Sequence, residues 1–85
     1  MQEAYIVAVN GGQRRRVPVG STLTVGRAAH CSLVIRDAAA SRQHLEVVRE
    51  GDAFICRDLG SRNGTLVNNE RVDRHELSHG DRIRV

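Results

Sequence analysis

Three polar clusters in this 85-residue chain combine residue types that can hold an anion. Their sequences are GR at 26–27, SRQH at 41–44 and SRNGT at 61–65. They supply the guanidinium groups of Arg27, Arg42 and Arg62, together with hydroxyl groups, an amide and a glycine-containing backbone. A guanidinium group can bind a phosphate through two parallel hydrogen bonds, so this combination favours recognition of a phosphorylated group.

The same clusters lack the pairs of groups that catalysis requires. No nucleophile lies beside a base in a known motif, and the spacing of His, Cys, Asp and Glu does not indicate a metal site. Cys31 and Cys56 are single cysteines outside any C-x-x-C motif. Donor groups without an acid–base pair hold an oxyanion but do not transform it. We therefore expect a binding domain that is not an enzyme and needs no metal or cofactor.

Composition and charge restrict the class of partner. The formal net charge is only +3, and the only aromatic residues are Tyr5 and Phe54, too few to stack on single-stranded nucleic acid. The run Arg14–Arg16 is interpreted as the solvated face of a strand. No apolar stretch reaches membrane-spanning length, and two unpaired cysteines are typical of a reducing compartment. We expect no nucleic-acid or membrane partner, and a cytoplasmic location.

Short apolar runs separated by turn residues must position the three clusters. The runs recur roughly every ten residues, which predicts an all-β sandwich or barrel without helices. Loops gather at the ends of a sandwich, so separate clusters can meet over one site. A hairpin turn is predicted at NGG (10–12) and a two-residue turn at Asn69–Glu70. The predicted strands cover residues 4–9, 15–19, 22–26, 32–35, 44–48, 53–59, 65–68, 71–72 and 81–85.

In order and spacing, GR…SRQH…DLGSRNGTLVN resembles the forkhead-associated (FHA) domain, a phosphothreonine-peptide reader. The resemblance extends from about Leu23 to Val85. It implies a single domain over residues 1–85, built as a β-sandwich of two antiparallel sheets with the binding loops at one end. The family continues past DRIRV with a glycine and a final strand. We therefore expect that the last strand is missing and that the chain is the N-terminal part of a longer protein.

The resemblance also implies roles for individual residues. Arg27 and Ser41 correspond to the arginine and the serine that bind the phosphate, and Asn63 corresponds to the asparagine that binds the peptide backbone. The residues expected to contact a phosphopeptide are Arg27, Ser41, Arg42, Ser61, Arg62 and Asn63. The residues expected to support the binding loops are Gly26, His44, Gly64, Thr65 and Asn68.

Two alternatives stay open at this point. The hydroxyl group of Ser61 could satisfy its own loop backbone and not touch a ligand. For the whole chain, the main hypothesis is a non-catalytic module that binds a phosphothreonine-containing protein or peptide in Ser/Thr-kinase signalling. The alternative is a phosphate-independent scaffold or oligomerisation domain, in which an open sheet edge pairs with, or exchanges a strand with, another chain.

Overall fold

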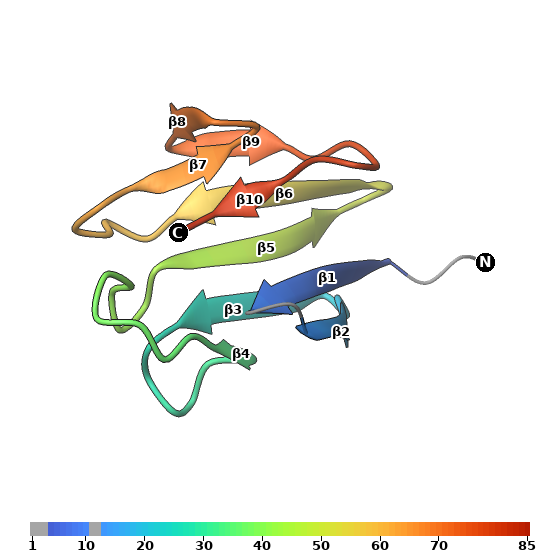
Figure 1. The fold of residues 1–85 in the computed structure, drawn as a ribbon. Helices are drawn as coiled ribbons and strands as arrows, with labels where there is room; N and C mark the ends of the chain where they lie inside the picture. Colours follow the sequence, from blue (N-terminus) through green and yellow to red (C-terminus); the bar gives the residue numbers. More distant parts are fainter. Residues whose placement is uncertain (1–3, 11–12) are drawn as a thin grey trace.

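The computed structural model describes residues 4–10 and 13–85, which form β-strands and no helix (Figure 1). The prediction of an all-β fold is confirmed. Over the described part of the chain, no helix is long and apolar enough to cross a membrane. The strands are β1 (Tyr5–Asn10), β2 (Gln13–Pro18), β3 (Thr22–Gly26), β4 (Leu33–Val34), β5 (Leu45–Glu50), β6 (Ala53–Asp58), β7 (Thr65–Val67), β8 (Glu70–Val72), β9 (Arg74–Glu76) and β10 (Ile83–Arg84).

The strands are hydrogen-bonded into three sheets. One sheet has five strands in the order β4-β3-β5-β6-β9, a second has the order β10-β7-β8, and β1 pairs with β2 alone. All pairs are antiparallel except β3–β4, which is parallel. Here the arrangement differs from the expected two antiparallel sheets. The loop at 27–32 carries the chain back before β4 begins, so β4 runs in the same direction as β3.

One buried apolar core connects the three sheets. In β3 and at the start of β5, buried side chains alternate with less buried ones, as in a strand with one face in a core. The buried faces of these strands meet apolar residues of β2 and β7, which makes the arrangement a sandwich. The buried cluster consists of Val17, Val19, Leu23, Val25, Leu45, Val47, Cys56 and Val67.

Two local features differ from the sequence prediction. The turn between β7 and β8 lies at Asn68–Asn69, one residue earlier than expected, with φ of 52° and 68°. Both positions need a positive φ, which Asn tolerates far better than Glu. Strand β9 is absent from the predicted strands, because its sequence RHE shows no apolar alternation. The predicted NGG turn includes residues 11–12, which lie outside the described residues.

The strand register brings the three polar clusters to one end of the sandwich. Val25 near the end of β3 pairs with Leu45 at the start of β5, and Leu45 pairs with Asp58 at the end of β6. The loops that leave or enter these positions therefore lie at the same end of the strands, and Figure 1 shows them together at the left of the molecule. The expected placement of the binding loops at one end agrees with this register.

Candidate functional site

The first two clusters are joined by a short backbone ladder. The amide of Arg27 donates to the carbonyl of Ser41 at 2.9 Å, and the amide of Ala28 donates to the carbonyl of Arg42 at 3.0 Å. The side chain of Arg27 adds a bond from Nε to the carbonyl of Ala40, at 3.1 Å. Nε of the guanidinium group is thus fixed, and the Arg27 residue is exposed to solvent.

Gly26 makes this close approach possible. A Cβ atom on Gly26 would lie 2.2 Å from the carbonyl oxygen of Arg42 and 3.0 Å from that of Ser41. These are backbone atoms, which cannot move aside as a flexible side chain can. The sequence therefore needs a glycine here so that β3 can end directly against the second loop, which supports the structural role expected for Gly26.

His44 joins the second cluster to the third. Its side chain is completely buried, with 0% of its surface exposed. Nδ1 lies 3.0 Å from the amide nitrogen of Ser41, and Nε2 lies 2.7 Å from the carbonyl oxygen of Gly64. An amide can only donate and a carbonyl can only accept, so these contacts assign the neutral ring with its proton on Nε2. The ring acts as a brace between the two loops.

Two further bonds bring the third cluster onto the second. The backbone amide of Arg62 donates to Ser41 Oγ at 2.9 Å. The side-chain amide of Asn63 donates to the carbonyl of Ala39 at 2.8 Å. Ser41, Arg62 and Asn63, which are up to 22 positions apart in the chain, therefore lie next to one another.

Asp58 organises the third loop, and the sequence pattern assigned it no role. Its carboxylate accepts from the amides of Gly60 and Ser61, both at 3.0 Å, and from the hydroxyl groups of Ser61 and Thr65. Burial alone would raise the pKa of Asp58, but the hydrogen bonds from Ser61, Thr65 and Gly60 outweigh it and lower that pKa below its ordinary value. A carboxylate directly before a Gly-Ser turn is the local signal that could have identified it.

The hydroxyl group of Ser61 is bonded within its own loop. It donates to Asp58 and accepts from the amide of Gly64, at 3.0 Å. Of the two roles considered for Ser61, these contacts support the one that stabilises the loop. Thr65 is fully buried and donates to the same carboxylate at 2.8 Å.

Gly64 and Asn68 differ in how they relate to the binding loops. Gly64 has a φ of +86°, which favours glycine, whereas the nearest neighbour of a Cβ atom there would be the flexible side chain of Arg71, at 2.7 Å. Asn68 lies at the other end of β7, where its side chain bonds to Asp81 and to the amide of Arg82, each at 3.0 Å. The structure therefore does not bring Asn68 to the loops that it was expected to support.

Arg27 also lines a surface hollow of about 350 Å³ together with Ala29, Val34 and Arg36. The parallel pairing of Gly26 with Val34 brings the segments after β3 and β4 side by side, so Arg36 comes to lie near Arg27. The arginines of the ion pairs in the described part of the chain are Arg57 and Arg74. Within the described residues, the guanidinium groups of Arg27 and Arg36 therefore form no ion pair with a carboxylate. Arg36 is a candidate site residue that the sequence pattern did not reveal.

The other two arginines expected at the site, Arg42 and Arg62, are exposed on the two neighbouring loops, outside the Arg27–Arg36 hollow. Among residues 4–10 and 13–85, no three His, Cys, Asp or Glu side chains are grouped so that they could hold a metal ion. The site is a donor-rich surface that combines exposed cationic groups with fixed amide and hydroxyl groups.

Comparison with known proteins agrees with this geometry. Residues 23–85 match the family model described as the FHA domain. A curated relative, the glycogen accumulation regulator GarA of Mycolicibacterium smegmatis, is 39% identical over 64 residues, which cover 75% of this chain and 40% of that protein. The chain thus spans less than half the length of this relative.

Two solved structures are similar in fold and in sequence. EmbR of Mycobacterium tuberculosis, solved with a low-affinity phosphopeptide, has a TM-score of 0.89 and 32% identity; the match covers 98% of this chain and 22% of EmbR. An FHA domain studied for its phosphothreonine-dependent interactions has a TM-score of 0.78 and 32% identity, and the match covers 94% of this chain and 82% of that domain.

Proposed function

The chain belongs to the FHA-domain family, and from this premise we propose that it binds phosphothreonine-containing segments of partner proteins in Ser/Thr-kinase signalling. It catalyses no reaction itself. The observation that carries the proposal is the hydrogen-bond network that gathers Arg27, Ser41 and Asn63 at one end of the sandwich. The EmbR complex with a phosphopeptide and the phosphothreonine-dependent FHA domain support the same ligand class.

The phosphate is bound by charge and by directed donors. A phosphothreonine carries roughly −1.5 to −2 charges at neutral pH and three acceptor oxygens. Arg27 is held at Nε by the Ala40 carbonyl, so its terminal amino groups are oriented toward the phosphate before the ligand arrives. Ser41 Oγ accepts from the amide of Arg62 and keeps its own proton, which it donates to a phosphate oxygen. Arg42 and Arg62 add positive charge from the exposed side of the loops.

Asn63 binds the peptide backbone. One hydrogen of its amide is used by the Ala39 carbonyl, and this bond fixes the side chain on the loop surface. The second N–H and the amide oxygen remain for a carbonyl and an amide of an extended peptide. Contacts with backbone groups do not depend on the peptide sequence, so Asn63 contributes affinity without selecting neighbouring residues.

Other residues of the site act through the loops they hold. Gly26, His44, Gly64 and Thr65 keep the loops at their spacing, and Ser61 fixes the third loop to Asp58. Each charge-assisted bond to the phosphate contributes about 1.5–3 kcal/mol before losses. Ordering of the peptide and loss of water offset much of this, which leaves a binding free energy of about −8 kcal/mol, or roughly micromolar affinity.

The first test is the substitution Arg27→Ala. We expect it to reduce the affinity for a phosphothreonine peptide by about 2–5 kcal/mol, from roughly micromolar to between tens of micromolar and millimolar, because the phosphate loses its fixed guanidinium partner. The fold should survive, since the Arg27 side chain is exposed and only its Nε bond is lost. Arg82→Ala removes an equal charge from an exposed position elsewhere and should leave the affinity unchanged.

The unphosphorylated form of the same peptide completes the experiment. Affinity retained by the folded Arg27→Ala protein would contradict the role of Arg27. Equal affinity for both peptides, or none for either combined with self-association in light scattering, would instead support the phosphate-independent scaffold. We also propose a cytoplasmic location, which the two buried free cysteines support.

A further inference from the structure

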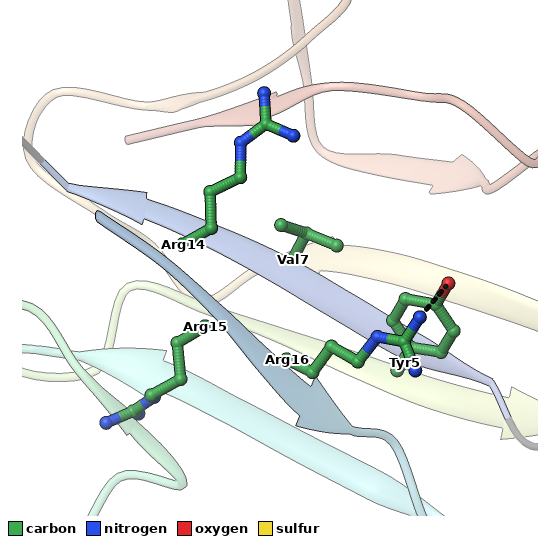
Figure 2. A pocket seen from close by; sticks show the side chains of 5 residues that line it. All are labelled: Tyr5, Val7, Arg14, Arg15 and Arg16. Carbon is green, nitrogen blue, oxygen red and sulfur yellow. Dashed lines mark hydrogen bonds between the residues drawn. The ribbon is translucent and has the colours of Figure 1, made fainter. Parts of the chain in front are cut away.

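The outer face of the β1–β2 hairpin gathers aromatic, aliphatic and cationic side chains. Val7 is paired with Arg16, and partners in an antiparallel ladder point to the same side of the sheet. Tyr5 and Arg14, two residues away along each strand, share that side, whereas Val17 is buried in the core. Figure 2 shows the four side chains along the hairpin, with Arg15 extending away from them. The five residues line a hollow of about 260 Å³.

Apolar surface on this face is open to solvent. Tyr5 is 45% exposed and Val7 is 46% exposed, and they are the exposed large hydrophobic residues of the described chain. The guanidinium group of Arg16 lies 4.3 Å from the centre of the Tyr5 ring and donates to its hydroxyl group at 3.3 Å. These contacts hold the aromatic ring in place, so a partner meets a surface that is already ordered. The face therefore offers a partner both apolar and cationic contacts.

The net positive charge is concentrated in the N-terminal part of the sequence, which contains this face. The first 36 residues carry five arginines and a single carboxylate, Glu3, whereas the remaining 49 residues carry eight arginines and nine carboxylates. The net positive charge of the protein therefore comes from its N-terminal half. The ion pairs of the described residues join side chains of the C-terminal half and include none of Arg14–Arg16. This charge distribution selects an anionic partner.

We propose that the outer face of the hairpin binds an acidic, extended segment of a partner protein that carries a carboxylate at every second position. Such carboxylates share one side of the segment and match Arg14 and Arg16, which are two residues apart on β2. The methylene groups of these acidic side chains cover Val7. Nucleic acid fits less well, because Arg16 already covers a face of the Tyr5 ring where a base would stack. A membrane surface would need more apolar area than one valine and one tyrosine provide.

The face is separate from the phosphopeptide site. None of its residues takes part in the hydrogen bonds that join the loops of Arg27, Ser41 and Asn63. A partner that carries both a phosphothreonine and an acidic segment would therefore bind at two places at once. The second contact would then be intramolecular and would raise the overall affinity.

The test uses an eight-residue peptide of alternating Asp and Val without phosphate, titrated by calorimetry at low salt. We expect saturable binding that Arg14→Gln/Arg16→Gln weakens by roughly tenfold or more. The control variant Arg82→Gln/Arg84→Gln makes the same change in charge at exposed positions of the C-terminal half and should bind like the unaltered protein. Val7→Asn should weaken binding by roughly threefold while all charges stay.

Four results would overturn the proposal. The first is an equal loss of affinity for the acidic peptide in the two double variants. The second is equal affinity of the unaltered protein for the acidic peptide and for an Asn/Val peptide. The third and fourth are tighter binding of oligo-dT, or of phosphatidylserine vesicles, than of the acidic peptide. The fold of each variant is checked by its thermal transition, and Arg14→Gln/Arg16→Gln should keep its affinity for a phosphothreonine peptide. Binding at the hairpin face and binding at the phosphopeptide site are thus measured with separate peptides, so that either proposal can be contradicted without the other.

Discussion

At the scale of single residues, Asp58 shows how an unassigned side chain can control a binding loop. Its carboxylate accepts hydrogen bonds from two backbone amides and two hydroxyl groups between positions 60 and 65. The loop turns through Gly60 and Gly64, both with positive φ, and the hydrogen bonds to Asp58 span this turn. The position of Asn63 therefore depends on a polar network with one carboxylate at its centre.

Asp58→Asn should lower the free energy of unfolding by about 1–3 kcal/mol at neutral pH, because an amide cannot accept all of these hydrogen bonds. The lowered pKa of Asp58 sets the direction of the pH dependence. The stabilisation is fully present above the ordinary value of 3.8 and is lost as the pH falls through the lower value of the folded state.

Urea unfolding at pH 7 and at about pH 3 measures both effects. The difference in stability between the unaltered protein and Asp58→Asn should shrink at the lower pH. Asp52→Asn, in the exposed turn between β5 and β6, is the control and should change stability little at either pH. A variant that is equally stable at pH 7 would show that the loop does not depend on this carboxylate.

Arg36 gives a second prediction for a single side chain. It shares a hollow with Arg27, and no carboxylate of the described residues neutralises either group by an ion pair. Arg36→Ala should weaken phosphothreonine-peptide binding by roughly threefold to tenfold and reduce its dependence on salt, because the hollow loses positive potential. Calorimetry at two salt concentrations, with Arg84→Ala as the control, measures both. An unchanged affinity at low salt would exclude Arg36 from the site.

At the scale of elements, the end of β3 is the point on which the loops depend. Gly26 lies directly against the carbonyl groups of Ser41 and Arg42, because it has no side chain to keep them apart. Its own carbonyl accepts from the amide of Ile35 at 2.8 Å, so the same residue also positions the segment after β4. Two loops are therefore set by the backbone of one strand end.

Gly26→Ala should destabilise the protein by more than about 2 kcal/mol, because the new Cβ atom would lie 2.2 Å from a backbone oxygen and forces β3 and the second loop apart. Phosphopeptide affinity should fall as well, since Arg27 moves with the strand end. The matched control is Gly20→Ala, where a Cβ atom meets nothing within 4 Å. Thermal unfolding compares the two variants, and similar transition temperatures would show that the close contact does not matter.

At the scale of the whole molecule, a single small core holds three sheets together. Cys56 on β6 lies in that core with 0% of its surface exposed. Burial, and to a smaller extent the charge of Asp58, raises the pKa of its thiol to about 11. Because the thiolate is the reactive form, Cys56 is protected both by its lack of access and by its protonation.

Alkylation of Cys56 should therefore report opening of the whole sandwich. At neutral pH we expect Cys56 to react with iodoacetamide orders of magnitude more slowly than an unfolded thiol, and the rate should rise with urea in parallel with global unfolding. Mass spectrometry of the digested protein separates Cys56 from Cys31. Rapid labelling of Cys56 in the absence of urea would show that the core opens locally.

The sequence by itself determined the class of fold and the three polar clusters. Alternating apolar residues and turn residues are local signals, so strands such as Thr22–Gly26 and Ala53–Asp58 follow from the pattern of the chain alone. The three polar clusters can be identified in the same way, because their residue types and their order are read directly from the chain.

Only the tertiary structure decided which groups meet. The parallel pairing of β4 brings Arg36 to Arg27, and the polar strand β9 forms because β6 offers it a partner. Likewise, the assignment of Ser61 to its own loop and the distance of Asn68 from the site follow from contacts with Asp58 and Asp81. Each of these depends on strand register and on direction of pairing. Both are set by packing between residues far apart in the chain, which no local pattern contains.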